Sequence, residues 1–166
     1  SIIKKGSLVS DKIINELIAE ILSKEKINDR LIFDGYPRSL NQTKELDKLF
    51  KKHNQKISCV ISLNVDKNTI IKRILGRENC LSCGQIFNQY FNPSNPETHN
   101  CNPKYLEKRT DDNEETIVNR FKTYLETTEP ILNFYKKQNL LYQINGKAEI
   151  NVIYKEIRQI LASIET

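Results

Sequence analysis

The residues best suited to chemistry form the string DGYPR at positions 34–38, with Gln42 four residues later. A short apolar run at residues 31–33 precedes the string and predicts a buried parallel strand. The string would then lie at the carboxyl end of a strand, where open α/β sheets bind their ligands. We therefore expect a binding site at this turn.

Each residue type in this string suits a phosphate or nucleotide ligand. Gly35 lets a ligand approach the backbone closely, and Pro37 fixes the turn. Arg38 can bind a phosphate through two parallel hydrogen bonds, and Asp34 suits a water-mediated contact with Mg²⁺. Gln42 carries a donor and an acceptor that match an adenine edge. The alternative is an ordinary strand–turn–helix connection with a surface arginine.

Arginine is used sparingly, which draws attention to where it occurs. The chain has 19 lysines and only seven arginines. Arg73 and Arg77 are four residues apart and are expected to share one face of a helix, while Arg109 precedes two aspartates and Arg120 borders an apolar stripe. Several convergent arginines are the equipment expected for phosphoryl transfer, which depends on positioning and charge neutralisation. For any one of them, the alternative is a surface salt bridge.

Four cysteines bear on the cellular setting. Cys80 and Cys83 form a C-x-x-C pair beside a glycine, which is a spacing typical of metal sites rather than disulfides. Cys101 lies further along, and Cys59 lies in an apolar run that predicts a core position. We expect a reducing, cytoplasmic environment.

Helices and strands are expected to alternate along most of the chain. Ser10 and Asp66 are expected helix caps, Asp112 and Glu115 have the spacing of a capping box, and Pro130 is expected to separate two helices. The expected elements are helices near 13–22, 41–52, 70–75, 117–125 and 150–164 and strands at 31–33, 57–65 and 140–144. This order predicts a P-loop-type parallel sheet with helices on both faces, a three-layer α/β/α fold. Residues 78–108 break the pattern, so we expect three segments: core at 1–77, an inserted small lid domain at 78–108, and core at 109–166.

Bulk composition narrows the functional class. Apolar residues make up 38% of the chain and charged residues 28%, and no apolar run approaches a membrane span. The net charge of +5 fits an anionic partner such as a nucleotide, but no dense basic block indicates nucleic acid. The sequence contains no methionine and opens like an internal stretch of protein, so we expect a fragment of a longer chain.

Taken in order, these motifs resemble the adenylate kinase family in its bacterial long-lid form. The resemblance covers essentially all 166 residues. It rests on Gly6 to Val9, the DGYPR string with Gln42, the stretch 73–77, Cys80 and Cys83, Arg109 with Asp111 and Asp112, Arg120, and Asn145-Gly146.

That resemblance implies a role for each matching position. It implies an AMP site that comprises Ser7, Leu8, Val9, Gly35, Tyr36, Pro37, Arg38 and Gln42, with Arg109 and Arg120. It implies that Arg73, Arg77, Arg109 and Arg120 surround the transferring phosphates, with Asp34 near Mg²⁺. It implies that Ile86, Phe87 and the backbone of Ala148 border the ATP base, beneath a lid that excludes water.

The sequence departs from the family in two places. The G-x-x-x-x-G-K-[ST] loop, which holds the ATP phosphates in this family, is absent. The chain is therefore either a fragment of a longer protein or an inactive remnant, and the intact set of arginines favours the fragment. Without the loop, we expect the fragment alone to lack kinase activity. The lid metal site is also incomplete. Cys80, Cys83 and Cys101 fit Zn²⁺ ligands, but Lys104 stands where a fourth is expected, and His99 could substitute. The alternative is a former metal site that is now held by packing.

The expected function is reversible phosphoryl transfer from Mg-ATP to AMP, giving two ADP, by a cytoplasmic monomer. Its closest rival is a kinase for another nucleoside monophosphate, such as UMP or CMP. The rival from a different class is a non-catalytic nucleotide-binding fragment.

Overall fold

The structure is a computed structural model that describes residues 10–23 and 31–164. It contains two compact units. We call Val65–Phe121 the insert unit, and the described parts of 10–64 and 122–164 the core unit. The predicted lid at residues 78–108 lies within the insert unit, and its boundaries stay a prediction.

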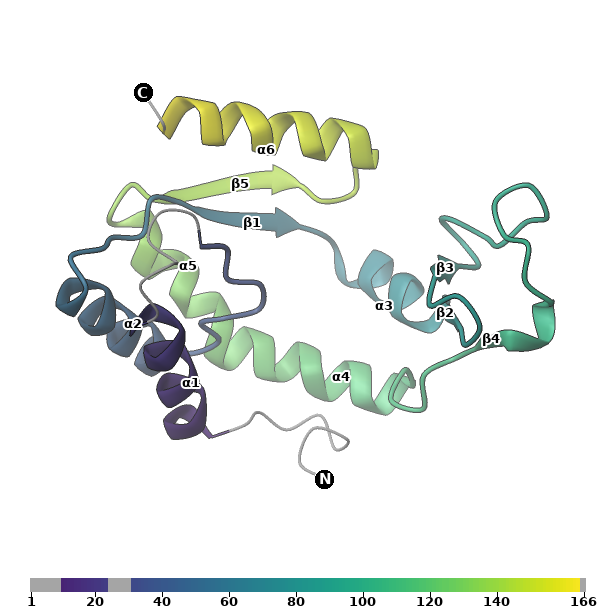
Figure 1. The fold of residues 1–166 in the computed structure, drawn as a ribbon, viewed down its shortest axis with the longest axis horizontal. Coiled ribbons are helices and arrows are strands. Elements are labelled where there is room, and N and C mark those ends of the chain that lie inside the picture. The colour runs from purple at the N-terminus through teal and green to yellow at the C-terminus, as the bar shows by residue number, and fades with distance from the viewer. Residues whose placement is uncertain (1–9, 24–30, 165–166) are drawn as a thin grey trace. The chain divides into compact units, whose positions relative to one another are not determined.

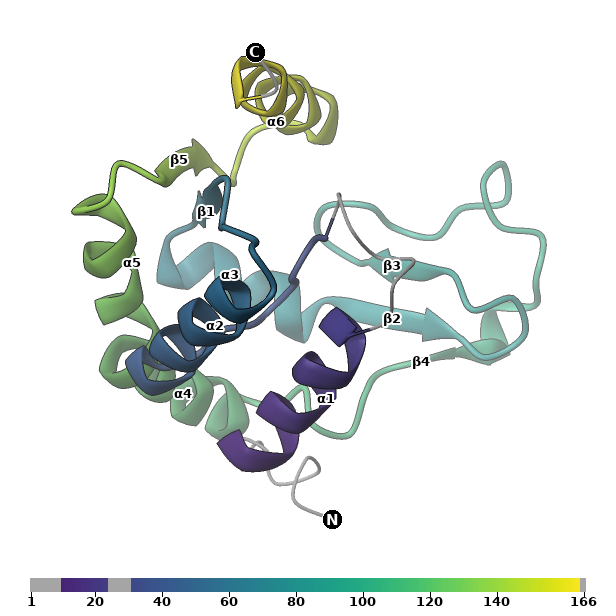
Figure 2. The same cartoon turned by 60° about the vertical axis from the view of Figure 1, so that its left-hand side comes forward.

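A parallel strand pair forms the middle layer of the core unit. β1 (Val60–Asn64) pairs with β5 (Leu141–Asn145) in parallel, with Val60 opposite Leu141 and Asn64 opposite Asn145. Helix α6 (Ile150–Ile164) covers one face of the pair, and α2 (Leu40–Lys52) and α5 (Glu129–Lys136) lie on the other, as Figures 1 and 2 show. This arrangement confirms the predicted α/β fold.

The helices α1 (Asp11–Ser23) and α2 begin where the sequence predicts. The carbonyl of Ser10 accepts the first hydrogen bond of α1, from Ile14 N at 3.3 Å. The side chain of Ser39 caps α2 by accepting from Gln42 N at 3.2 Å. Both helices contribute to one apolar cluster, which consists of Leu22, Leu46 and Phe50 with partly buried neighbours.

The strand predicted at residues 31–33 is wrong. These residues are extended but form no ladder, and Ile32 is 92% exposed. Leu31 and Phe33 nevertheless pack against the Leu22 cluster, so the segment alternates between a buried and an exposed side like a strand. A strand needs a hydrogen-bonded neighbour, and in the part of the chain that the structure describes β1 pairs only with β5.

The predicted break between two helices at Pro130 is wrong, because Pro130 lies within the first turn of a helix. A π-helical turn at Tyr124–Thr128 joins α4 (Glu114–Thr123) to α5, and Pro130 lies in the first turn of α5. Proline is tolerated there because first-turn amides have no partner within the helix. The chain therefore stays helical through Pro130.

The insert unit combines two helices with a small antiparallel sheet. Asp66 caps α3 (Lys67–Leu75) by accepting from Thr69 N at 3.0 Å, as predicted. The sheet has the strand order β3-β2-β4, formed by Ile86–Asn88, Arg77–Cys80 and Leu106–Glu107. A short 3₁₀ turn at Pro103–Tyr105 precedes β4.

Two local predictions in this unit are wrong. Arg77 does not share a helix with Arg73, because α3 ends at Leu75 and Arg77 begins β2. A Cβ on the intervening Gly76 would lie 2.6 Å from the Tyr90 ring and 2.7 Å from Asn88 Oδ1, so the chain needs glycine at this junction. The residue that caps α4 is Asn113, which accepts from Thr116 N at 2.9 Å, and not Asp112.

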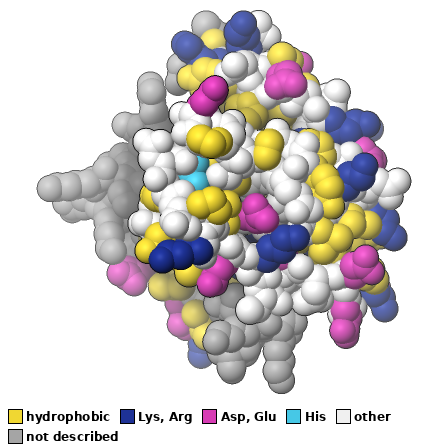
Figure 3. Space-filling model, turned by 90° about the vertical axis from the view of Figure 1, so that its right-hand side faces the viewer, with side chains coloured by type: hydrophobic (Ala, Val, Ile, Leu, Met, Phe, Trp, Pro, Cys, Tyr) yellow, Lys and Arg dark blue, Asp and Glu magenta, His cyan; other side chains and the backbone are white. Residues whose placement is uncertain are grey.

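Among the described residues, no helix has the length and apolarity to cross a membrane. The face drawn in Figure 3 carries acidic and basic side chains interspersed with hydrophobic ones.

Candidate functional site

The DGYPR turn folds the Arg38 side chain back onto its own backbone. Arg38 Nε donates to the carbonyl of Gly35 at 2.6 Å. Gly35 has a φ of +69°, and a Cβ there would lie 2.8 Å from Arg38 Nη2. Only glycine meets both demands without strain. Arg38 is exposed, and its remaining guanidinium N–H groups can donate to an anion.

Gln42 lies behind this turn and is almost fully buried, with 1% of its surface exposed. Its Oε1 accepts from Arg38 N at 2.7 Å, and its Nε2 donates to Asp11 Oδ1 at 2.7 Å. The hydroxyl of Thr128 donates to the carbonyl of Arg38 at 3.0 Å. The turn is therefore held from α1, from α2 and from the π-helical turn.

In the insert unit, three of the predicted arginines gather on two adjacent aspartates. Arg77 forms a bidentate pair with Asp112, with Nε to Oδ2 at 2.8 Å and Nη2 to Oδ1 at 2.6 Å. Arg109 binds both oxygens of Asp111, at 3.0 and 2.9 Å. Arg120 Nη2 donates to Asp111 Oδ2 at 2.6 Å. We call these five residues the arginine–aspartate cluster.

Burial and charge differ across this cluster. The Asp112 side chain has no exposed surface, and its hydrogen bonds raise the pKa of Arg77. The hydrogen bonds from Arg109 and Arg120 outweigh the opposing effect of burial and lower the pKa of Asp111 to about 2. The side chains of Arg109 and Arg120 remain 47% and 34% exposed. The carboxylates therefore fix the arginines and leave N–H groups free to bind phosphate.

Arg73 lies apart from the aspartates. Its guanidinium lies 5.5 Å from the centre of the Phe91 ring, and its carbonyl accepts from Asn88 Nδ2 at 2.7 Å. A cation–π contact positions a guanidinium without using its N–H donors. Arg73 can thus still bind an anion.

The four predicted metal ligands come together in the insert unit. One ligand atom each from Cys80, Cys83, His99 and Cys101 lies within 4.8 Å of the others. Gly84, with a φ of +74°, turns the chain after the C-x-x-C pair, and its amide donates to the carbonyl of Cys80 at 2.8 Å. Three thiols and one imidazole form a common tetrahedral zinc set.

The surroundings of His99 support a metal ligand. Its Nδ1 lies 2.9 Å from the Ser94 hydroxyl, and its ring packs against Phe87 with centroids 4.7 Å apart. Nε2 is buried and forms no hydrogen bond with any residue that the structure describes. A buried imidazole nitrogen without a partner is costly, and a metal ion would satisfy it.

The cysteines of the group differ in acidity. A hydrogen bond from the Gln85 backbone lowers the pKa of Cys83, but burial and hydrogen bonds with Cys80 and Cys101 outweigh it and raise that pKa. Burial raises the pKa of Cys80, but hydrogen bonds from the backbone N–H groups of Cys83 and Ser82 outweigh it and lower that pKa to about 6. The thiolate is the form that binds metal. Cys59, the cysteine outside the group, is half-buried, and burial raises the pKa of its thiol.

The remaining predicted site residues are found in both units. Ile86 and Phe87 lie in β3, where Ile86 is 64% exposed while Phe87 is buried against His99. Asp34 is exposed at the turn, and Ala148 follows β5, where its amide donates to the carbonyl of Asn145 at 3.2 Å. Ser7, Leu8 and Val9 lie outside the described residues.

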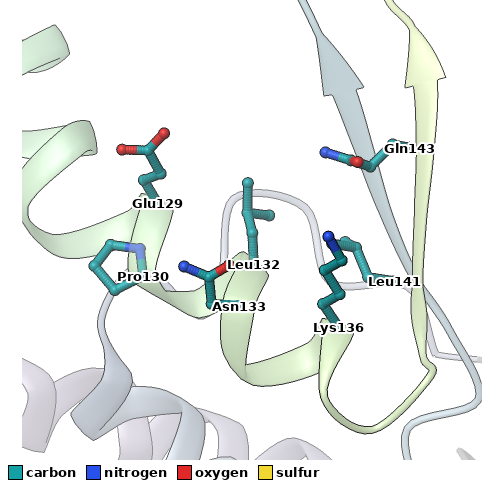
Figure 4. Close-up of a pocket in the computed structure, with 7 residues that line it drawn as sticks. All are labelled: Glu129, Pro130, Leu132, Asn133, Lys136, Leu141 and Gln143. Carbon is teal, nitrogen blue, oxygen red and sulfur yellow. The ribbon is translucent and has the colours of Figure 1, made fainter.

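A shallow pocket in the core unit contains none of the predicted residues. Figure 4 shows its walls, which come mainly from one face of α5 and from β5. It is lined by Glu129, Pro130, Leu132, Asn133, Lys136, Leu141 and Gln143. This surface offers no cluster of arginines and carries no argument about function.

Sequence reasoning missed three carboxylates of the site. Asp111 and Asp112 position the arginines, and the signal available was two consecutive aspartates beside Arg109. Asp11 binds the Gln42 amide from 31 residues away, and no local pattern indicates that contact.

Comparisons with known proteins agree on one family. The family model described as adenylate kinase matches residues 1–140. The adenylate kinase of Pelagibacter ubique is 42% identical over 160 residues, which cover 96% of this chain and 75% of that protein. The adenylate kinases of Enterococcus faecalis and Archaeoglobus fulgidus are 36% and 35% identical, over 97% and 98% of this chain and 76% and 75% of those proteins.

Proposed function

The chain belongs to the adenylate kinase family. We propose that the product of its complete reading frame catalyses reversible transfer of a phosphoryl group from Mg-ATP to AMP, giving two ADP. Its relatives support a nucleotide-binding kinase that acts on a nucleoside monophosphate. The proposal includes AMP as the acceptor of the phosphoryl group. It also includes that the protein is a cytoplasmic monomer that does not bind nucleic acid.

The arginine–aspartate cluster is the observation that carries the proposal. Phosphoryl transfer spreads negative charge over the oxygens of the moving group, and fixed cations stabilise that charge. Arg77, Arg109 and Arg120 are held by Asp111 and Asp112 before any substrate binds. Such preorganised groups need no rearrangement during the reaction, which is the usual source of electrostatic catalysis. Arg73 would join them from above the Phe91 ring.

In this proposal the DGYPR turn binds AMP. Arg38 would hold the AMP phosphate through the guanidinium N–H groups that Gly35 does not use. Gly35, Tyr36 and Pro37 would shape the turn around that phosphate, and Gln42 would read adenine. Ser7, Leu8 and Val9 would line the same site, as the family resemblance implies, and Arg109 and Arg120 would contact the AMP phosphate during transfer.

The ATP side of the proposal rests on the insert unit and on the turn after β5. Ile86 has the exposed surface to cover the ATP base, while Phe87 would support it from beneath. The backbone of Ala148 would border the same base. Mg²⁺ would accompany ATP, with Asp34 as a water-mediated ligand.

We also propose a structural zinc ion held by Cys80, Cys83, His99 and Cys101. The support is the approach of all four ligand atoms and the unpartnered Nε2 of His99. A bound metal would supply folding free energy to a small sheet that has few buried apolar residues. Catalysis would not pass through this ion.

Arginine substitutions test the proposal directly. In the product of the complete reading frame, Arg109→Ala and Arg120→Ala should each lower kcat for ADP formation by about a hundredfold, the loss typical of removing one preorganised donor. Arg158→Ala is the control, because Arg158 lies over the Tyr154 ring on α6 and outside the cluster. Unchanged rates in both cluster variants would refute the assigned role.

A further inference from the structure

The carboxylate of Asp11, at the start of α1, contacts the side chain that is proposed to read the base. Asp11 Oδ1 accepts from Gln42 Nε2 at 2.7 Å, and Asp11 Oδ2 accepts from Asn41 Nδ2 at 3.1 Å. On the opposite side, Gln42 Oε1 accepts from the backbone N–H of Arg38 at 2.7 Å. The buried amide of Gln42 is therefore held at both of its polar atoms.

These two contacts fix which way round the amide lies. If the amide turned over, its oxygen would face the Asp11 carboxylate, acceptor against acceptor. Its NH₂ group would face the N–H of Arg38, donor against donor. Both hydrogen bonds would be lost together, and leaving the polar atoms of a buried amide without these partners is costly.

The amide still has hydrogen-bonding capacity for a ligand. An amide NH₂ group carries two hydrogens and its oxygen two lone pairs, and the contacts above use one of each. Counting the contacts among the described residues, one donor on Nε2 and one acceptor on Oε1 remain. Their order along the amide is fixed by Asp11 and Arg38.

That order distinguishes adenine from a base with the opposite pattern. Adenine presents an acceptor at N1 and a donor at its 6-amino group, which suit Nε2–H and Oε1. Hypoxanthine, the base of IMP, presents a donor at N1 and an acceptor at O6. Its pairing with the same glutamine would need the amide turned over, and an unpaired buried polar group costs more than a hydrogen bond contributes.

We propose that Asp11 is a specificity-determining residue, which makes the enzyme prefer 6-aminopurine over 6-oxopurine monophosphates by fixing the orientation of the Gln42 amide. Asp11 acts through Gln42 and need not touch the nucleotide, so it is a positioning residue. The inference rests on the proposed function, since it requires that Gln42 reads the base.

Asp11→Asn tests this with little change of shape. Asparagine can present either its oxygen or its NH₂ group to Gln42, so it keeps a hydrogen bond between α1 and α2. It removes the contribution of Asp11 to the amide orientation and leaves only that of the Arg38 N–H. We expect the ratio of kcat/KM for AMP to that for IMP to fall by about tenfold, as for loss of one charged hydrogen bond, mainly because IMP use rises. Asn41→Ala is the matched control, because it removes the other partner of Asp11 and leaves Gln42 untouched. This control should leave the ratio within about twofold of the parent, by the same scale.

The experiment measures ADP formation from ATP with AMP or IMP, using the product of the complete reading frame, together with calorimetric Kd values for both monophosphates. If Asp11→Asn lowers use of AMP and IMP equally, Asp11 only anchors α1 and the inference is wrong. If the ratio stays at the parent value, the inference also fails while the proposed function stands. If the unmutated protein makes no ADP from ATP and AMP, the proposed function is wrong. This outcome is seen without any variant, so it is distinguishable from a failure of the inference about Asp11.

Discussion

Substitution of Gly35 by alanine tests whether the turn is built to position Arg38. Gly35 has a φ of +69°, a left-handed conformation that costs an ordinary residue about 1–2 kcal/mol. The new methyl group would lie 2.8 Å from Arg38 Nη2 and would push the guanidinium away. Loss of the 2.6 Å hydrogen bond to the Gly35 carbonyl would add about 1 kcal/mol. We expect the free energy of unfolding to fall by about 2–3 kcal/mol, the sum of these effects.

The same substitution should weaken use of AMP. A displaced Arg38 cannot keep its bidentate contact with a phosphate, and charged hydrogen bonds of this kind are worth about tenfold or more in affinity. The KM for AMP should therefore rise about tenfold while the KM for ATP changes little. The assay is steady-state ADP formation, accompanied by urea unfolding of the same variant.

Gly84→Ala provides the matched control. Gly84 has a φ of +74°, so alanine there meets the same backbone strain, but no atom lies within 4 Å of its new Cβ. We expect a smaller loss of stability, about 1–2 kcal/mol, and an unchanged KM for AMP. If Gly35→Ala also leaves the KM for AMP unchanged, the reasoning about Arg38 is refuted.

Three further predictions follow from the same contacts. Arg38→Lys keeps the charge but loses the planar fork, so the KM for AMP should rise more than the KM for ATP; equal KM values in variant and parent would exclude a bidentate role. The pKa of Asp111 is lowered from 3.8 to about 2 by Arg109 and Arg120, so its stabilising contribution is complete above about pH 4 and is lost as the pH falls towards 2. Asp111→Asn should flatten that part of a stability–pH profile, and an unaltered profile would contradict the pairing. Protein purified without chelator should contain one zinc ion per chain, and removing that ion with a chelator should lower the melting temperature by several degrees. The variant Cys101→Ser should lose the metal, and the control variant Cys59→Ser should keep it.

Local patterns predicted the elements whose causes are local. Asp66, a predicted cap, accepts from Thr69 N at the start of α3, three positions away, a contact that a short stretch of sequence can indicate. Cys80 and Cys83 were predicted from their C-x-x-C spacing, and Cys101 and His99 were added because thiols and imidazoles nearby can complete a zinc set.

Predictions failed where a distant partner decided the outcome. Asp112 has the spacing of a helix cap, but its carboxylate binds Arg77, 35 residues earlier, so Asn113 caps α4 instead. Residues 31–33 have the composition of a strand but lack a described neighbour with which to pair. The contact between Asp11 and Gln42 likewise joins residues 31 positions apart. A sequence pattern reports what a residue can do, and the fold decides which partner it has.

The acceptor of the phosphoryl group is the central claim, and product analysis tests it most directly. The product of the complete reading frame would be incubated with ATP, Mg²⁺ and one monophosphate, and all nucleotides would be separated and quantified over time. The account predicts that AMP and ATP disappear in equal amounts and that two ADP form for each pair, with much slower transfer to CMP or UMP. Faster transfer to a pyrimidine monophosphate, or loss of ATP without loss of AMP, would contradict it.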